Sequence, residues 1–141
     1  MKISQLDHLV LTVSDLDRTC AFYSKVLCME VRTSDTNRTS LHFGTAKINL
    51  HKFGAEFTPH ALTPKPGSAD ICLLTWTPIE TVLEHLVHHQ IDIIEGPVKR
   101  TGAAGTLLSV YFHDPDGNLL EVANTIPPPD NQQRENTKNA A

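Results

Sequence analysis

The sequence lacks a long hydrophobic run and a signal-type N-terminus. None of its apolar stretches approaches the roughly 20 residues that a membrane-spanning helix needs. Residues 1–5 do not combine a charged region with a following apolar one, which a secretory signal requires. We therefore expect a cytoplasmic protein that does not use a membrane as a partner.

Cysteine and clustered positive charge are also scarce. Cys20, Cys28 and Cys72 are an odd number without C-x-x-C spacing, so neither a disulfide framework nor a zinc knuckle is indicated. The net charge is −4 with the eight histidines neutral, and Lys and Arg are scattered along the chain. This charge pattern argues against nucleic acid as a partner.

A strong strand-to-helix signal stands near the start of the chain. Residues 6–13 alternate in polarity, which predicts a strand whose more apolar face points away from His8. Ser14, followed three residues later by a carboxylate, predicts the N-cap of a helix over about 15–27. The histidine therefore lies on the face where a core residue is not required.

The same order of elements occurs twice. A Pro- and Gly-rich linker at 54–67 separates two similar halves, and Thr77 is the expected cap of a second helix. The remaining strands are predicted at 29–33, 39–43, 47–51, 68–75, 91–94, 107–112 and 118–123. We predict an α+β fold with one βαβββ module at 1–53 and another at 68–126. Residues 127–141 contain no large apolar side chain and are expected to form a disordered tail.

Overlaying the halves aligns four positions on the less apolar strand faces. An offset of 62 places His8 on Asp70 in the first strand of each half. An offset of 72 places Asn49 on Glu121 in the last strands, and His51 shares a face with Asn49. The repeat thus groups residues that would be weak evidence for a site if each were considered alone.

Imidazole and carboxylate groups that converge from different strands are suitable ligands for a divalent metal ion. Burying several ionisable groups on one concave surface would be costly without a cation. We predict a metal site built from His8, His51, Asp70 and Glu121. Whether Asn49 or His51 faces the ion stays open.

Three segments carry a family resemblance: LDHLVLTVSDL at 6–16, FYSKVL at 22–27 and YFHDPDGNLLE at 111–121. With these segments the chain resembles the vicinal-oxygen-chelate superfamily of glyoxalases, bleomycin- and fosfomycin-resistance proteins and extradiol dioxygenases. Residues 47–51 and 68–73 are most similar to small glyoxalase-domain-containing, lactoylglutathione-lyase-like proteins.

The resemblance implies curved mixed sheets that form a barrel-like cavity around a divalent ion such as Zn, Ni, Mn or Co. It also implies a homodimer, with His8 and Glu121 at the first and last ligand positions. Asp70 departs from the histidine common at its position, and Asn49 departs from Glu or Gln. Cys28 replaces a usual glycine where positive φ is often needed, at a cost of about 1 kcal/mol.

The predicted function is that of a metal-dependent lyase or isomerase of the glyoxalase I type. Its substrate would be a small vicinal-oxygen compound, such as the methylglyoxal–glutathione hemithioacetal, which is a glutathione adduct. The ion would stabilise an enediolate while Glu121 or His51 moves a proton. Two alternatives stay open: a metal-free protein that sequesters a small molecule or antibiotic, and a metal-dependent antibiotic thiol transferase. An iron dioxygenase ranks last, because Asp70 stands where a histidine is expected.

Overall fold

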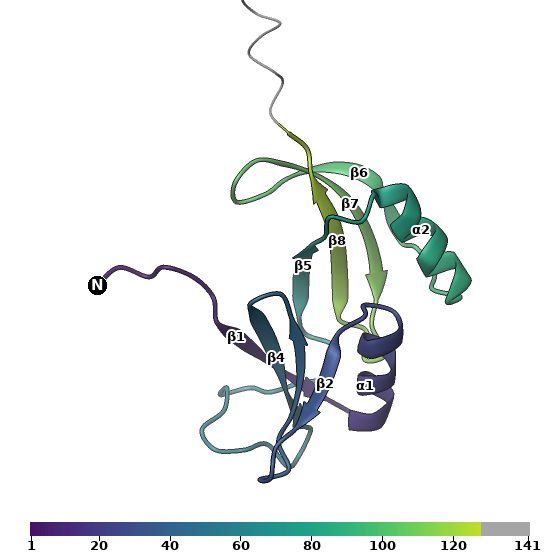
Figure 1. The fold of residues 1–141 in the computed structure, drawn as a ribbon. Coiled ribbons are helices and arrows are strands. Elements are labelled where there is room, and N and C mark those ends of the chain that lie inside the picture. Colours follow the sequence, from purple (N-terminus) through teal and green to yellow (C-terminus); the bar gives the residue numbers. More distant parts are fainter. Residues whose placement is uncertain (128–141) are drawn as a thin grey trace, which may run out of the picture.

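The computed structural model describes residues 1–127, which form two modules with the same order of elements (Figure 1). The first module contains β1 (His8–Val13), α1 (Leu16–Lys25), β2 (Glu30–Thr33), β3 (Thr39–Phe43) and β4 (Ala46–Lys52). The second contains β5 (Asp70–Leu74), α2 (Ile79–His88), β6 (Glu95–Thr101), β7 (Thr106–His113) and β8 (Leu119–Thr125). The predicted duplication is confirmed, whereas the expected disordered tail lies almost wholly outside the described residues.

Each module has one mixed four-stranded sheet, in the orders β1-β4-β3-β2 and β5-β8-β7-β6. β1 pairs with β4 in parallel, and Val10 lies opposite Asn49. β5 pairs with β8 in parallel, and Cys72 lies opposite Glu121. These two pairs are related by the offsets of 62 and 72 found in the sequence, so the repeat extends to the strand register. The two sheets are separate, and residues 1–127 form no closed barrel.

The core lies between the sheets and the helices, which are on the same side of the molecule in Figure 1. Alternate strand residues turn apolar side chains toward this layer, and burial of their surface stabilises the fold. Buried strand residues that face this layer include Leu11, Val13, Leu41, Ile48, Leu50, Val110, Phe112, Leu120 and Val122. His8 therefore lies on the opposite sheet face, as predicted. Neither helix within residues 1–127 is long and apolar enough to cross a membrane.

The helix starts differ in detail from the prediction. Asp15, not Ser14, caps α1: its backbone is extended, and its carboxylate accepts a hydrogen bond from the Arg18 N–H at 2.8 Å. α2 follows Pro78 without a side-chain cap, and the Thr77 N–H instead donates to the Thr75 hydroxyl. The hydroxyl cap rule therefore placed both starts one residue too early.

The sixth strand was also misplaced. Residues 91–94 are not a strand; β6 runs from Glu95 to Thr101 and includes Pro97. β6 is an edge strand, and its register shifts between Glu95 and Val98 around the proline. Proline, which has no N–H to donate, is tolerated at such bulges and edges. The Gly-Pro pair thus lies within a strand although it is typical of a turn.

A buried polar joint connects α1 with the β7–β8 turn. The Tyr23 hydroxyl donates to Asp114 Oδ2 at 2.8 Å, and both residues are buried. Asp114 also accepts hydrogen bonds from the backbone N–H groups of Asp116 and Asn118 and from the Asn118 side chain. Burial and the nearby carboxylate raise the pKa of Tyr23, so its hydroxyl stays protonated. This joint fixes one module against the other.

Cys28 has a φ of +55°, which agrees with its place at a position where glycine is usual. Because its side chain is exposed, little packing is lost when it is removed. Cys28→Gly should raise the free energy of unfolding by about 0.5–1 kcal/mol, measured by urea denaturation. Cys20→Gly, inside α1, should instead lower it by about 1 kcal/mol. A loss of stability in both variants would contradict this explanation.

Candidate functional site

The predicted site residues lie on the sheet faces that turn away from the helices. In the first sheet, the face of His8 also carries Asn49 and His51, because alternate residues of paired strands share a face. In the second sheet, Asp70 and Glu121 share a face. The structure therefore gives each module one polar face, as the repeat predicted.

His8 is hydrogen-bonded to the carboxylate of the preceding residue, Asp7. Its Nδ1 lies 2.7 Å from Asp7 Oδ2, and 43% of its side chain is exposed. Since a carboxylate only accepts, Nδ1 carries a proton, and Nε2 is the ring nitrogen that points away from Asp7. Carboxylate–histidine pairs of this kind orient metal-binding imidazoles. The hydrogen bond with His8 lowers the pKa of Asp7, a residue that sequence reasoning did not single out.

Glu121 carries a buried carboxylate oxygen without a hydrogen-bond partner. Its Oε1 is inaccessible to solvent and receives no hydrogen bond within the described chain. Cys72 and Tyr111 lie opposite Glu121 on the neighbouring strands. Burial and the carboxylate raise the pKa of Cys72 to about 11, so it stays a thiol at neutral pH. Burial and the same carboxylate also raise the pKa of Tyr111.

Burying a carboxylate oxygen without a hydrogen-bond partner costs folding free energy. An unsatisfied buried acceptor typically costs about 1–3 kcal/mol, and more when it is charged. Buried polar atoms that lack a partner within the protein often mark a functional site or the place of an ion. Glu121 thus carries one carboxylate oxygen that no donor of the described chain satisfies, although Cys72 and Tyr111 interact with its carboxylate.

Asp70 and Asn49 occupy the other two repeat positions. Asp70 is the exposed first residue of β5, two residues from Cys72 and on the same face as Glu121. Asn49 is partly buried in β4, with Val10 and Ser40 as its strand neighbours. Both side chains therefore reach the polar faces.

His51 lies farther from His8 than the sequence alone could show. It is opposite Thr12, whereas His8 is opposite Lys47, four residues earlier on β4. At about 3.3 Å per residue this separates the two histidines by about 13 Å along the sheet. One ion with ligands at about 2 Å cannot bind both imidazoles in the same chain. Burial, His60 and Arg38 lower the pKa of His51, so its ring is neutral at pH 7.

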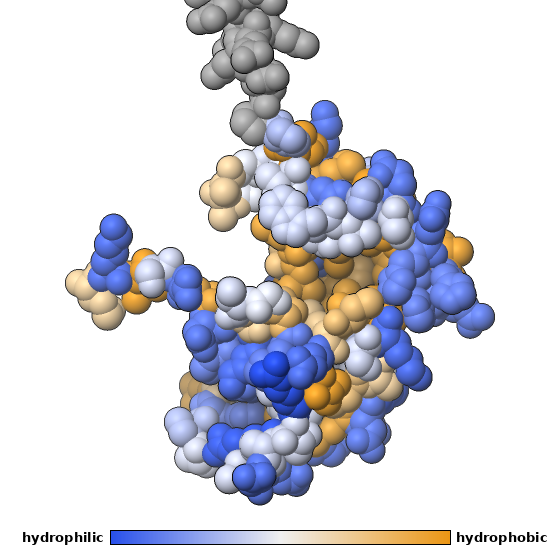
Figure 2. All heavy atoms as spheres, viewed as in Figure 1, coloured by the Kyte–Doolittle hydropathy of each residue, from blue (hydrophilic) through white to orange (hydrophobic). Residues whose placement is uncertain are grey.

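The described residues do not bring the predicted ligands together in one cluster. Within residues 1–127, no three His, Cys, Asp or Glu side chains come close enough to hold a metal ion. Large apolar side chains on or beside the edge strands β1 and β5 are exposed, namely Leu6, Val10, Leu74 and Trp76. Figure 2 shows hydrophobic surface gathered between the modules. The polar faces are therefore flanked by exposed apolar surface of the kind that marks an interaction site.

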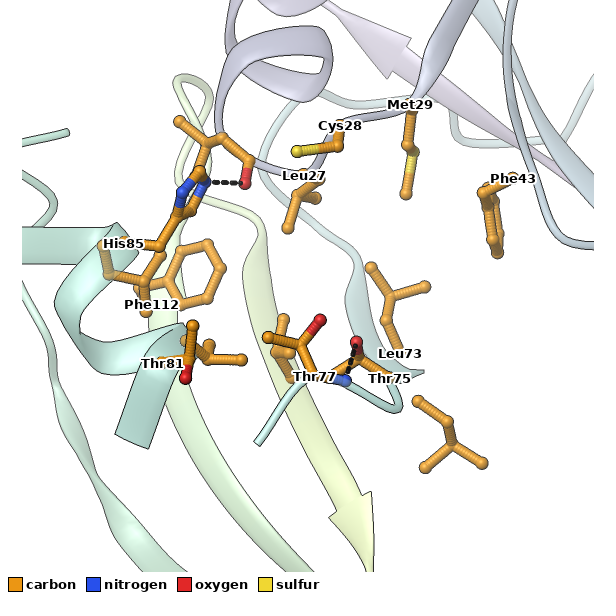
Figure 3. A pocket seen from close by; sticks show the side chains of 15 residues that line it. Leu27, Cys28, Met29, Phe43, Leu73, Thr75, Thr77, Thr81, His85 and Phe112 are labelled. Atoms are coloured by element: carbon orange, nitrogen blue, oxygen red, sulfur yellow. Dashed lines mark hydrogen bonds between the residues drawn. The ribbon is translucent and has the colours of Figure 1, made fainter. Parts of the chain in front are cut away.

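A cavity of about 310 Å³ lies between the modules (Figure 3). Leu27, Cys28 and Phe43 line it from the first module, and Leu73 and Phe112 line it from the second. Leu73 and Phe112 belong to the helix-facing side of the second sheet, opposite to Glu121. The lining that residues 1–127 provide contains no carboxylate and none of the predicted ligands. Sequence reasoning missed it because its residues come from distant segments.

His85 closes one side of this cavity. Its Nε2 lies 2.8 Å from the Val26 carbonyl oxygen, as the dashed line in Figure 3 shows. Because a carbonyl only accepts, this nitrogen carries a proton. His85 is thus a contact between α2 and the end of α1 rather than a ligand.

Comparisons with known proteins agree with this architecture. A family model for the glyoxalase/bleomycin resistance protein/dioxygenase superfamily matches residues 5–122. The virulence protein STM3117 of Salmonella typhimurium is 50% identical over 126 residues, which cover 89% of this chain and 88% of that protein. Its crystal structure superimposes with a TM-score of 0.88, covering 89% of this chain and 100% of that one.

Two further proteins extend the comparison. The glyoxalase domain-containing protein RDO1 of Mycosarcoma maydis is 48% identical over 123 residues, covering 87% of this chain and 69% of that protein. The lactoylglutathione lyase of Agrobacterium tumefaciens superimposes with a TM-score of 0.68 at 20% identity, covering 88% and 96% of the two chains. At that identity the match shows a shared fold and no more.

Proposed function

Because the chain belongs to the glyoxalase/bleomycin resistance protein/dioxygenase superfamily, we propose that it is a metal-dependent lyase or isomerase of the glyoxalase I type. The proposed substrate is a small compound with two vicinal oxygens, such as the methylglyoxal–glutathione hemithioacetal. The family match and the 48% identity to a glyoxalase domain-containing protein support this class of reaction.

The observation that carries the proposal is the unpartnered Oε1 of Glu121. A divalent ion fits this oxygen, the free Nε2 of His8 and the exposed carboxylate of Asp70. Asn49 can add an amide oxygen from the fourth repeat position. When bound, the ion would hold the two substrate oxygens and favour the negative charge that develops on them.

We propose that two copies of the chain complete this site. His8 and Asn49 lie on one sheet, Asp70 and Glu121 on the other, and residues 1–127 of a single chain gather no ligand cluster. Placing β1 of one copy beside β5 of another would bring the two polar faces together and cover the exposed Val10 and Leu74. A two-fold dimer would then contain two equivalent sites.

The reaction also needs a base beside the carbon that loses its proton. Glu121 is our first candidate, because no donor within the described chain holds its Oε1. His51 is the second, since its lowered pKa leaves the ring free to accept a proton at pH 7. The separation of His51 from His8 along the sheet favours Glu121.

Metal analysis of protein made without a histidine tag tests the proposal. Wild type should bind about one ion per chain and convert the hemithioacetal, whereas His8→Ala should bind the ion at least about tenfold more weakly. His88→Ala, which changes an exposed histidine of α2, is the control and should behave as wild type. Stoichiometric binding that His8→Ala leaves unchanged would refute the proposed ligand set.

The cavity between the modules favours one alternative, a metal-free protein that binds a small apolar molecule. Its lining is mostly apolar, and it lies away from the polar faces. Such a protein would bind its ligand equally well after His8→Ala and Glu121→Ala are combined. Loss of ligand binding in that double variant would exclude this alternative.

A further inference from the structure

The polar face of the first module contains a second cavity, of about 580 Å³, which we call the hairpin cavity. It lies between the β2–β3 hairpin and the end of β4, and Phe57 of the linker forms one wall. Its polar lining includes Arg38, Ser40, Lys47 and Asn49. The lining drawn from residues 1–127 contains no Asp or Glu. A cavity with several cations and no acid is complementary to an anion.

Arg38 is presented to this cavity without a carboxylate partner. Within residues 1–127 no ion pair involves Arg38 or Lys47. The Arg38 guanidinium lies 4.4 Å from the centre of the Phe57 ring, and such stacking restricts the group while leaving its N–H donors available. A planar fork of donors held in this way suits a carboxylate or phosphoryl group.

The surroundings keep this charge from being cancelled. Glu30, the acid of the adjacent strand, binds Arg32 through both oxygens, at 2.9 and 2.8 Å. The positive charge of Lys47 contributes to the lowered pKa of Asp7, but the Asp7 carboxylate is hydrogen-bonded to His8. Glu56 accepts a hydrogen bond from the Gly54 N–H. Glu30, Asp7 and Glu56 therefore each have a partner other than Arg38.

We propose that the hairpin cavity is a subsite for an anionic oxygen group, with Arg38 as its main ligand and Lys47 and Ser40 as further donors. As a substrate subsite it rests on the proposed function, because Asn49 connects it with the predicted metal position on the same face. The substrate class is then a vicinal-oxygen compound that also carries a carboxylate or a phosphoryl group.

A titration of the full-length protein with inorganic phosphate tests the subsite without a metal. Amide resonances are followed by NMR in the presence of EDTA, at constant ionic strength. Saturable shifts should appear in the β2–β3 hairpin and at His51. A second titration with acetate shows whether a carboxylate is accepted as well as a phosphoryl oxygen.

Arg38→Gln should weaken phosphate binding at least about tenfold, since it removes a charge-assisted, bidentate hydrogen-bonded contact. Arg38 is exposed, so this variant should fold normally. The control Lys65→Gln removes the same charge from the linker and should change binding by less than about twofold. No saturable shifts with either anion, or equal weakening by the two variants, would overturn the proposal.

This experiment is independent of the metal. Phosphate binding at the hairpin by a protein that binds no metal would support the subsite and refute the proposed enzyme. Metal-dependent turnover without anion binding at the hairpin would support the proposed enzyme and refute the subsite.

Discussion

Replacing Glu121 by Gln should lower turnover of the hemithioacetal by about 100-fold or more, the range expected when a positioned base is lost. The change keeps the shape of the side chain and removes its negative charge. It should also weaken metal binding, because an amide is a poorer ligand than a carboxylate. Steady-state kinetics at saturating metal, together with a metal titration, measures both effects.

The same substitution should not destabilise the metal-free protein. Glu121 Oε1 is buried without a partner, so removing its charge should leave the free energy of unfolding unchanged or raise it by up to about 1 kcal/mol. Glu84→Gln removes the same charge from an exposed position of α2 and should leave turnover unchanged. A destabilised Glu121→Gln with near-normal turnover would show that Glu121 is structural.

Replacing Asp114 by Ala should lower the free energy of unfolding by about 3–5 kcal/mol. The carboxylate is buried and accepts hydrogen bonds from Tyr23, from the Asn118 side chain and from two backbone N–H groups. Alanine would leave these donors unsatisfied and would release the joint between the modules. Urea denaturation followed by circular dichroism measures the loss.

Two further variants identify the cause of that loss. Asp114→Asn keeps the shape and one acceptor oxygen, so it should lose less stability than alanine. Asp35→Ala changes an exposed carboxylate in the β2–β3 turn and should stay within about 0.5 kcal/mol of wild type. An Asp114→Ala protein as stable as Asp35→Ala would contradict the role given to the buried joint.

The fold could be predicted because the chain carries the same pattern twice. The alternation that put His8 opposite the apolar side of β1 also set the faces of β4, β5 and β8. The offsets relating His8 to Asp70 and Asn49 to Glu121 then reappear as equivalent registers in the two sheets. Local side-chain alternation and repetition were sufficient for this part.

The errors concern features that depend on the tertiary context. Pro97 breaks a typical strand, but an edge position and a bulge accommodate it in β6. Ser14 has the side chain of an N-cap, yet its N–H bonds to Asp116, 102 positions away in the sequence, while Asp15 caps the helix. Neither the bulge around Pro97 nor the long-range hydrogen bond of Ser14 can be inferred from the neighbouring residues in the sequence.

The site was only partly predictable for a related reason. Strand alternation put His51 on the face of His8, but only the β1–β4 register shows that the two lie four residues apart. The Asp7 contact that orients His8, and the Phe57 ring that stacks on Arg38, depend on side-chain geometry and on the path of the linker. The grouping of His8, Asp70 and Glu121 around an ion stays a prediction.

Mixing two inactive variants tests most directly whether one ion joins His8 of one chain to Glu121 of another. His8→Ala and Glu121→Ala are unfolded together in equal amounts, refolded with metal, and assayed for bound ion and turnover. Each variant alone should be inactive, whereas random pairing should restore about one quarter of the wild-type sites. A mixture that recovers neither bound ion nor turnover would contradict the shared site.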